Sequence, residues 1–414
     1  MDRTPPNQVR KRRVFYIPGY DPFHPRRYRE LYRREGADQA KISGYSLDLK
    51  PKTAGDTFGW HVAGDMDGAQ VSAEFDVLLW SDIVRASMAG TIPGTYAQLV
   101  RTAWTYFSTG ALWRLMRLRK GPVIAALYPV GMLLGQLALA VALAALVRAG
   151  LARGIDAVMP SAGVAGNALA LVAGLGAAVA ALRWFKAKDN KLFAYYLMHD
   201  YAYSAQSRGA YPPELEQRMA QFGDAIAAAL DTDVDEVLVV GHSSGAHLAV
   251  SILSDLIRAG RVPPKGPHLA FLSLGQVVPM VSFLPRAHRL RADLQFLSTR
   301  DELVWVDVSA PGDGCAFALC DPVAVSGVAT KGKRWPLVFS AAFTQSLSPA
   351  RWKELRWRFF RLHFQYLCAF DRPRDYDYFR ITAGPVTLKD RYAGRPASRS
   401  RIETPVSKYA SVAA

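Results

Sequence analysis

The chain has 414 residues and a mass of 45.5 kDa, which is long enough for one large domain or two of ordinary size. Half of the residues are hydrophobic and 21% are charged, which excludes a disordered polymer and a fibre. Lysine and arginine number 51 against 35 acidic residues, so the formal net charge is +16. The three cysteines are too few for a disulfide scaffold, and Cys315 and Cys320 lack the second pair of a zinc ribbon; we expect no metal and no cofactor.

Strands and helices are expected to alternate before residue 120. Residues 13–18 (RVFYIP) should form a buried strand that ends at a Pro-Gly turn, and arginines and tyrosines at helical spacing predict a helix over residues 25–36. An amphipathic helical stretch is expected over residues 83–120. The other strands expected in this part cover residues 41–49, 57–63 and 71–80.

Two long apolar runs follow. Residues 121–147 contain no charged side chain, and neither do residues 157–182. At about 1.5 Å per residue, each run is about 40 Å long, enough to cross a hydrocarbon layer of about 30 Å. A buried hairpin of a soluble protein is the alternative, but core helices rarely extend this far without a polar face. We therefore expect two transmembrane helices, joined by a short loop that contains Arg148, Arg153 and Asp156.

Small residues at a spacing of four are expected to hold the two helices of this hairpin together. In lipid, such residues let helix backbones approach closely. They are Gly131 and Gly135 in the first run and Gly166, Ala170, Gly174 and Ala178 in the second. Pro160 falls in the first turn of the second helix, where its missing N–H is tolerated.

Charged residues beside the two runs predict how the hairpin is oriented. Lysines and arginines gather on its outer flanks, at positions 114, 117, 119, 120, 183, 186, 188 and 191, whereas the connecting loop has two arginines. The positive-inside rule then places both long flanks in the cytoplasm. No secretory signal peptide is expected at the polar, basic N-terminus. The basic excess favours the anionic inner leaflet as a partner surface, and no motif supports binding to nucleic acid.

Helices and strands alternate again after the second run. A strand over residues 236–241 is followed by a helix over residues 246–259. Further strands are expected at residues 268–274, 303–309 and 335–343, and further helices at residues 191–207, 213–230 and 288–297. Residues 358–367 are compatible with either a strand or a helix. The alternation predicts an α/β fold with a mostly parallel sheet and helices on both faces.

The domain organisation follows from this pattern. Neither flank of the apolar runs looks able to form a domain by itself, so we expect one domain built from residues 13–120 and 184–388. A transmembrane hairpin over residues 121–183 would interrupt it, and the polar residues 389–414 would form a tail with little structure.

The strongest local motif is a G-x-S-x-G that runs from Gly241 to Gly245. It begins where the strand of residues 236–241 ends, and it leads directly into the next helix. In this setting Ser243 is lifted on a sharp strand–turn–helix, and the two glycines keep the neighbouring strand and helix clear of the turn. A solvated turn serine in a Rossmann-like unit is the alternative.

With this motif in this context, the chain resembles the α/β-hydrolase superfamily of serine esterases and lipases. The resemblance covers about residues 13–85 and 190–385. It implies a catalytic triad in the chain order serine, acid, histidine, with the acid after a later strand and the histidine after the last one. Ser243 would be the nucleophile.

The chain order of the triad leaves His363 as the candidate catalytic histidine, because it is the histidine that lies beyond the candidate acids. It follows the aromatic stretch WRFFRL, a candidate last strand. A structural histidine on a helix is the alternative. For the acid, Asp313 is the first choice because it lies in the turn beyond the strand of residues 303–309. Asp307 within that strand and Asp321 further along the loop are the alternatives.

An oxyanion hole needs backbone N–H groups that point at the developing negative charge. The resemblance implies that Ser244, the residue after the nucleophile, supplies one of them. The second should come from the loop after the first strand, where Gly19 permits a tight turn and the amide of Tyr20 or Asp21 is in place to donate. A simple strand-ending Pro-Gly turn is the alternative.

The resemblance implies a serine hydrolase that cleaves an acyl ester or thioester through an acyl-enzyme, and the two apolar runs predict that it is anchored in the membrane. A lipophilic substrate is expected because the hairpin would hold the pocket beside the lipid. Two alternatives stay open: an acyltransferase that uses the same triad, and a non-catalytic hydrolase-like domain that serves as a membrane interaction module.

Overall fold

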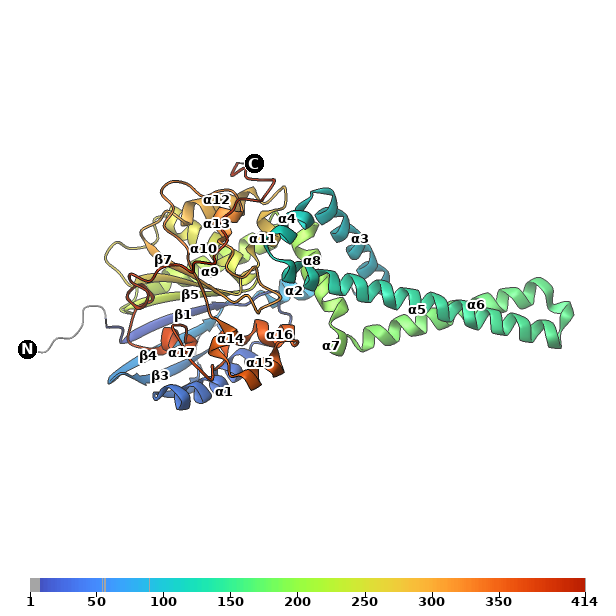
Figure 1. Ribbon diagram of the computed structural model, residues 1–414, viewed down its shortest axis with the longest axis horizontal. Helices are drawn as coiled ribbons and strands as arrows, with labels where there is room; N and C mark the ends of the chain where they lie inside the picture. The colour runs from blue at the N-terminus through green and yellow to red at the C-terminus, as the bar shows by residue number, and fades with distance from the viewer. Residues whose placement is uncertain (1–7, 54, 56, 89, 414) are drawn as a thin grey trace, which may run out of the picture. The chain divides into compact units, whose positions relative to one another are not determined.

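The computed structural model describes residues 8–53, 55, 57–88 and 90–413. Within them, eight strands form one sheet in the order β2-β3-β4-β1-β5-β6-β7-β8 (Figure 1). The pairs β2–β3 and β3–β4 are antiparallel, and the other pairs are parallel. The strands are β1 (Lys11–Ile17), β2 (Ser46–Pro51), β3 (Gly59–Met66), β4 (Ala69–Val77), β5 (Glu236–His242), β6 (His268–Leu274), β7 (Leu303–Ser309) and β8 (Leu337–Ser340). The predicted α/β fold with a mostly parallel sheet is confirmed.

Strand β1 joins the two flanks of the chain in this sheet. It pairs with β4 on one side and with β5 on the other, although the two long apolar helices lie between β4 and β5 in the sequence. Every residue of β5 is buried, as is typical of a central parallel strand covered on both faces.

Helices cover both faces of the sheet, as predicted. One face is covered by α9 (Pro213–Leu230), α10 (Gly245–Arg258) and α12 (His288–Leu297), and the other by α1 (Arg26–Ser43) and α17 (Tyr378–Ala383) (Figure 1). The shorter helices are α2 (Ser81–Ser87), α4 (Ala111–Leu118), α11 (Val278–Ser282), α13 (Pro322–Val325), α14 (Phe343–Ser346), α15 (Pro349–Leu355), α16 (Phe359–His363), η2 (Gln365–Leu367) and α18 (Leu388–Arg391).

The chain divides into two compact units. The sheet unit contains the chain up to Ala86, residues Tyr106–Val123, and the chain from Ser207 onward. The helical unit contains Ser87–Thr105 and Ile124–Gln206. The helices that lie wholly or mostly in it are α3 (Ile92–Ser108), α5 (Lys120–Val158), η1 (Pro160–Ala162), α6 (Gly163–Ala187), α7 (Asp189–Leu192) and α8 (Ala194–Gln206).

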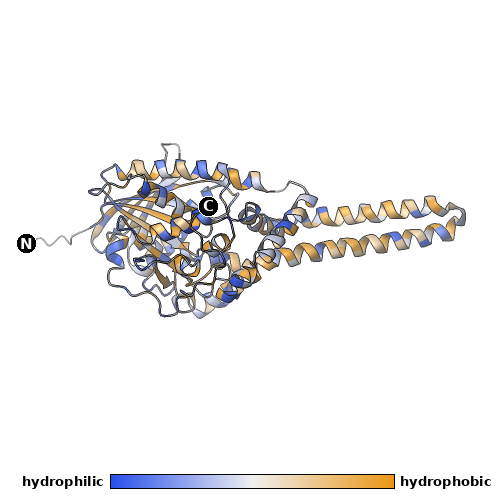
Figure 2. Ribbon diagram, turned by 90° about the horizontal axis from the view of Figure 1, so that it is seen from above, coloured by the Kyte–Doolittle hydropathy of each residue, from blue (hydrophilic) through white to orange (hydrophobic). Residues whose placement is uncertain are grey.

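Two helical segments of this second unit, Lys120–Val158 and Pro160–Ala187, are long and apolar enough to cross a membrane. Their most apolar windows have mean hydropathies of 2.3 and 1.9, and only 17% of each window is buried. The two helices lie side by side and are apolar along most of their length (Figure 2). A core helix of a soluble protein would bury most of such a surface, so low burial separates these helices from that alternative.

The small residues of α6 make the contact between the two helices. Gly166, Ala170 and Gly174 are buried, and a Cβ on Gly174 would lie 2.7 Å from the carbonyl oxygen of Ala144 in α5. Gly131 and Gly135 of α5 were expected to take part in this contact, and that prediction was wrong. A Cβ on either glycine would lie in open space, with no described neighbouring atom within 4 Å. The close approach therefore depends on the small residues of α6 and falls on the distal half of α5.

The prediction that Arg148, Arg153 and Asp156 lie in a loop was also wrong. Helix α5 continues through all three residues to Val158, and the chain turns at residues 159–162. Alanine, leucine and arginine dominate this stretch and are strong helix formers, so isolated charges do not end the helix.

Two expected elements in the first part of the chain have different bounds. The strand predicted over residues 41–49 begins only at Ser46, because α1 continues to Ser43 and ends at Gly44, whose φ of 72° is left-handed. The single helical stretch predicted over residues 83–120 is broken into separate helices. Gly110, at φ 71°, separates α3 from α4, and extended backbone at Arg119 separates α4 from α5.

The segment from Lys389 onward lies against the sheet unit. The N–H of Ser398 donates to Val338, and the N–H of Ile402 donates to Leu319. Near the C-terminus, the Arg291 side chain donates to the carbonyl of Ser411 over 2.7 Å. Beyond Arg391, the described residues form one isolated bridge and no helix, so this tail has defined contacts with little regular structure.

Candidate active site

Ser243 lies at the junction between β5 and α10. Its backbone has a φ of 56°, in the left-handed region that a non-glycine residue occupies at a cost of about 1–2 kcal/mol. The N–H of Ser243 donates to the carbonyl of Leu274 over 3.0 Å, which fixes the turn to the end of β6. The side chain is half-buried, so it is accessible from solvent. A strained residue held this firmly at a strand end is typical of a functional position.

The glycines on either side of Ser243 permit close backbone approach. A Cβ on Gly245 would lie 2.1 Å from the carbonyl oxygen of Ile17, and a Cβ on Gly241 would lie 2.8 Å from Cα of Ala246. Real Cβ atoms do not approach backbone this closely, so only glycine fits at either position. Gly245 thus lets the start of α10 pack directly against the end of β1, which places Ser243 beside Gly19.

Asp313 and His363 come together from distant parts of the sheet unit. Asp313 lies in the turn beyond β7, where its N–H donates to the carbonyl of Ala310 over 2.8 Å. His363 is the last residue of α16. The Nδ1 of His363 lies 2.7 Å from Oδ2 of Asp313, and both side chains are buried. Because the carboxylate only accepts, Nδ1 carries the hydrogen and Nε2 keeps its lone pair.

The surroundings of Asp313 keep its carboxylate charged. Burial opposes ionisation, but the charge and hydrogen bond of His363, the N–H of Cys315 and the hydroxyl of Tyr366 outweigh it, so the pKa of Asp313 is lowered. The Cys315 N–H lies 2.9 Å from Oδ1, and the Tyr366 hydroxyl lies 3.0 Å from Oδ2. A carboxylate held in this way both orients the imidazole and stabilises its protonated form.

Ser243 and His363 flank the same two residues, Leu274 and Gly275. Leu274 accepts the N–H of Ser243, and a Cβ on Gly275 would lie 3.2 Å from Cε1 of His363. No direct hydrogen bond joins the Ser243 hydroxyl to His363 in the described part of the chain. In substrate-free enzymes such bonds are often long and tighten when substrate binds.

Two further side chains support His363, and the motif analysis did not identify either. The ring of His242 packs against that of His363 at a centroid distance of 4.8 Å, and its Nε2 donates to the His363 carbonyl over 3.0 Å. Burial, followed by the repulsion that a protonated His363 ring would exert, lowers the pKa of His242 to about 3, so the His242 ring stays neutral and donates. Tyr366 lies three residues beyond His363, and this spacing across a tight helical turn is the signal that could have identified it.

Residues 358–367 had been compatible with either a strand or a helix, and the candidate last strand before His363 is not formed. Phe359–His363 forms helix α16, and the last strand is β8. A five-residue aromatic run has no distinct period, so packing around the site decides its conformation.

The loop after β1 lies beside the nucleophile. A Cβ on Gly19 would lie 3.0 Å from Cβ of Ser243, and Trp80 holds the turn by donating from Nε1 to the Pro18 carbonyl over 3.0 Å. Tyr20 is buried with its ring edge-to-face against Trp80. The N–H of Ser244 has no hydrogen-bond partner among the residues that the structure describes. Of the candidate oxyanion residues, Gly19 therefore lies against Ser243, Tyr20 is the next residue of the same loop, and Ser244 follows the serine in the chain.

The two alternative acids are occupied elsewhere. Asp307 accepts a hydrogen bond from the Ser273 hydroxyl over 2.6 Å, inside the sheet. Asp321 caps the N-terminus of α13 and pairs with Lys333. Of the three candidate acids, Asp313 is the one that contacts His363.

Asp307 gives a prediction about stability. Burial raises its pKa to about 7, so the folded protein holds a proton that the unfolded chain releases. The free energy of unfolding should therefore fall as pH rises from about 4 to about 7, by up to about 4 kcal/mol from this group. Asp307→Asn should remove this dependence, measured as the difference between variant and wild-type unfolding curves across that range. Identical pH dependence in both proteins would contradict a buried, protonated Asp307.

Among the described residues, Asp313, Cys315 and His363 form a group that could hold a metal ion, since their potential ligand atoms all lie within 4.8 Å of one another. An ion there would have to displace the hydrogen bonds that Asp313 accepts from His363 and Tyr366. The arrangement fits a proton-transferring pair without such a displacement.

Comparison of this chain with protein-family models, with curated proteins and with solved structures found no match.

Proposed function

We propose that this chain is a membrane-bound serine hydrolase of the α/β-hydrolase type that cleaves a carboxylic ester or thioester. One observation carries the proposal: a strained, accessible serine at a strand–turn–helix and a buried Asp–His pair contact the same two residues, Leu274 and Gly275. Ser243, Asp313 and His363 follow the chain order serine, acid, histidine that the α/β-hydrolase superfamily uses.

In the proposed mechanism, Nε2 of His363 takes the proton of the Ser243 hydroxyl while Oγ attacks the acyl carbonyl carbon. Asp313 accepts from Nδ1 and stabilises the imidazolium. The N–H groups of Ser244 and Tyr20 stabilise the oxyanion of the tetrahedral intermediate. When this intermediate collapses, the alcohol or thiol leaves with the proton from His363, and the acyl group stays on Ser243.

The second half repeats these steps with water as the nucleophile. His363 removes a proton from the water as its oxygen attacks the acyl-enzyme. The intermediate collapses, the C–Oγ bond breaks, and His363 returns the proton to Ser243. The product is a carboxylic acid, and the enzyme is regenerated without a cofactor.

The membrane part of the proposal is supported by the hairpin. Its exposed apolar side chains include Ile124, Leu134, Leu139, Val141, Leu146, Leu169 and Val172. A surface of this kind is stable in lipid and unstable in water. Basic residues on both outer flanks of the hairpin support a cytoplasmic sheet unit under the positive-inside rule. We therefore infer a lipophilic acyl substrate drawn from the inner leaflet.

Labelling of carbonate-washed membranes with a fluorophosphonate probe tests the class of enzyme. The wild-type chain should be labelled and should stay with the membrane pellet, because the probe reacts with an activated serine. Ser243→Ala should lose all labelling, whereas Ser72→Ala, which changes an exposed serine on β4, should keep it. A metal chelator should leave labelling unchanged, because the mechanism uses no ion.

Ser243→Gly distinguishes loss of the nucleophile from loss of the fold. Ser243→Gly removes the hydroxyl and also relieves the left-handed strain, so it should be unlabelled and no less stable than wild type. A folded wild-type chain that is not labelled, or a labelled Ser243→Gly variant, would reject Ser243 as the nucleophile. Loss of labelling with chelator would favour the metal arrangement of Asp313, Cys315 and His363.

A further inference from the structure

An exposed aromatic and basic stretch lies on the sheet unit, just before the proposed triad histidine. It covers residues 356–361 (RWRFFR), which lead from the end of α15 into α16, and we call it the α16 patch. Trp357 is 72% exposed and Phe359 is 46% exposed. Among the described residues of the sheet unit, no large apolar side chain is more exposed than Trp357. Exposed rings that lie this close together mark an interaction surface.

The patch is strongly basic. The nine residues that end at Arg361 contain four basic side chains and one acidic side chain, Glu354. Glu354 pairs with Arg358 over 3.2 Å and with Arg361 over 3.6 Å, so two guanidinium groups share one carboxylate. No carboxylate of the described residues pairs with Arg356, whose guanidinium lies 5.5 Å from the centroid of the Trp357 ring. The partner that fits this surface is therefore anionic and has an apolar part beside its charges.

The start of α5, which belongs to the sheet unit, packs beside this patch. A Cβ on Gly314 would lie 3.0 Å from Cδ1 of Phe359, and a Cβ on Gly121 would lie 3.4 Å from Cα of Gly314. The side chain of Arg119 also donates to the carbonyl of Ala318 over 2.8 Å. Phe359 and the first turn of α5 therefore approach the same glycine of the loop after β7, and the charge-free run of α5 begins at this point.

Aromatic and basic side chains also precede α5 in the sequence. Phe107 and Trp113 are exposed, with ring centroids 6.4 Å apart, and Arg117 and Lys120 are exposed as well. Tryptophan beside basic residues is typical of the boundary between lipid headgroups and acyl chains, because its ring is apolar at one end and polar at the other. Two groups of this composition thus border the start of α5, one in the sequence and one in space.

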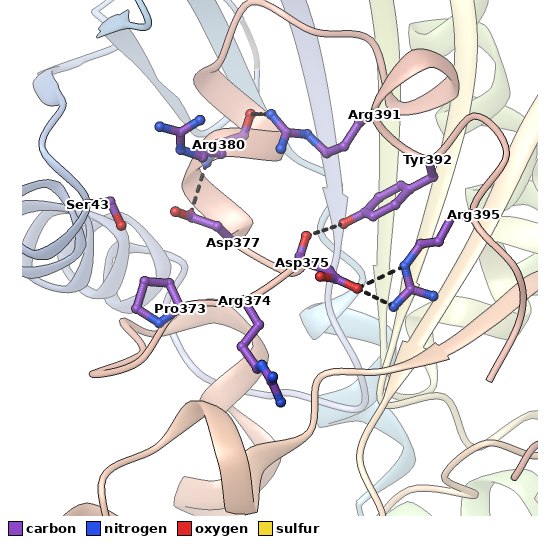
Figure 3. Close-up of a pocket in the computed structure, with 9 residues that line it drawn as sticks. All are labelled: Ser43, Pro373, Arg374, Asp375, Asp377, Arg380, Arg391, Tyr392 and Arg395. Carbon is purple, nitrogen blue, oxygen red and sulfur yellow. Dashed lines mark hydrogen bonds and ion pairs between the residues drawn. The ribbon is translucent and has the colours of Figure 1, made fainter. Parts of the chain in front are cut away.

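Another group of arginines in the sheet unit lacks the exposed rings. It lines an open cavity of about 630 Å³ beside α17 and α18 (Figure 3). There Arg395 pairs with Asp375 over 2.6 Å, and Arg380 pairs with Asp67 over 2.8 Å. None of the described residues that line this cavity is an exposed large apolar side chain. The α16 patch differs from it in combining cations with exposed aromatic rings.

We propose that the α16 patch docks on the anionic lipid headgroups of the membrane that α5 crosses, with Trp357 and Phe359 inserted at the boundary with the acyl chains. Lipid is the partner because the patch adjoins the start of a candidate spanning helix, and because its cations and rings match the two layers of a leaflet surface. Docking holds α16, which ends at His363, at the bilayer surface. The inference rests on the membrane part of the proposed function and not on its catalytic part.

Photo-crosslinking of the full chain in vesicles tests the proposal. The vesicles contain phosphatidylcholine with about 30% phosphatidylglycerol, which supplies the anionic surface. The variants are Trp357→Bpa in the patch, Val141→Bpa on the exposed surface of α5 and Ser72→Bpa on β4, where Bpa is p-benzoylphenylalanine. Ser72 is the negative control, because it is exposed and lies at the end of the sheet opposite Ser243. Mass spectrometry should detect lipid adducts on the Trp357 and Val141 variants and none on the Ser72 variant.

Removal of charge provides a second readout. In the Trp357→Bpa chain, Arg356→Gln combined with Arg358→Gln should lower the yield of lipid adduct at least about fivefold, because each basic residue near an anionic leaflet strengthens binding by about this factor. Arg261→Gln combined with Lys265→Gln should leave the yield unchanged. This control removes the same charge from two exposed residues in the loop before β6, at the opposite end of the sheet.

The two positions separate failure of this inference from failure of the membrane proposal. Lipid adducts on the Val141 variant without adducts on the Trp357 variant would overturn the docking and leave the spanning hairpin in place. Absence of adducts on both would reject the membrane part of the proposed function as well. A Trp357 adduct with a second copy of the chain, or equal loss of yield in the Arg261 and Lys265 control, would also overturn the docking. The acidic surface of a protein would then be the partner that the same charges fit.

Discussion

Asp313→Asn is expected to lower kcat for ester hydrolysis about 10³–10⁴-fold with little change in KM. Asparagine can still accept from Tyr366 and Cys315, so the fold should be preserved. It carries no charge to stabilise the imidazolium, and its amide can present an N–H to Nδ1 and so select the wrong tautomer of His363. The measurement is steady-state hydrolysis of a chromogenic short-chain ester by the solubilised chain.

Asp307→Asn is the matched control, because it makes the same chemical change within β7, six residues before Asp313. Asp307 contacts Ser273 and not His363, so its variant should keep kcat within about threefold. If Asp307→Asn lost activity and Asp313→Asn kept it, the triad would have to be reassigned. Loss in both variants without loss of folded protein would show that the two acids act together.

The second large effect is expected from Gly245→Ala, which should destabilise the sheet unit by at least about 3 kcal/mol. The added Cβ would lie 2.1 Å from the carbonyl oxygen of Ile17 and 2.8 Å from that of Pro18. Both neighbours are backbone atoms at the end of β1, so neither can rotate away as a side chain would. The change should appear as a lower yield of protease-resistant protein and a lower melting temperature.

Gly223→Ala provides the opposite result from the same substitution. Gly223 lies within α9, and a Cβ there would meet no described atom within 4 Å. Alanine is favoured over glycine inside a helix, so this variant should be more stable by about 0.5–1 kcal/mol. Equal behaviour of the two variants would show that the contact between α10 and β1 is looser than the structure indicates.

Several elements could be predicted from the sequence because their signals are local. Helices α9 and α12 and strands β6 and β7 have the bounds that periodicity predicts. The two apolar runs and the turn around Ser243 were also visible, since each depends on residues that are neighbours in the chain. A repeat of 3.6 or 2.0 residues, or an uninterrupted apolar run, needs no knowledge of the rest of the molecule.

Other features were decided by tertiary packing. The position of β1 between β4 and β5 depends on pairing across the whole hairpin, and no local pattern encodes it. The helical state of Phe359–His363 follows from its packing, because a run of five residues this short is compatible with either state.

The candidate site likewise has features that depend on local sequence and features that depend on tertiary structure. The serine, its glycines and the order of the three triad candidates could be read from the sequence alone. The contact of Asp313 with His363 and the support from His242 and Tyr366 could not. Each of these joins residues far apart in the chain, and only the sheet with its covering helices brings them within hydrogen-bond distance.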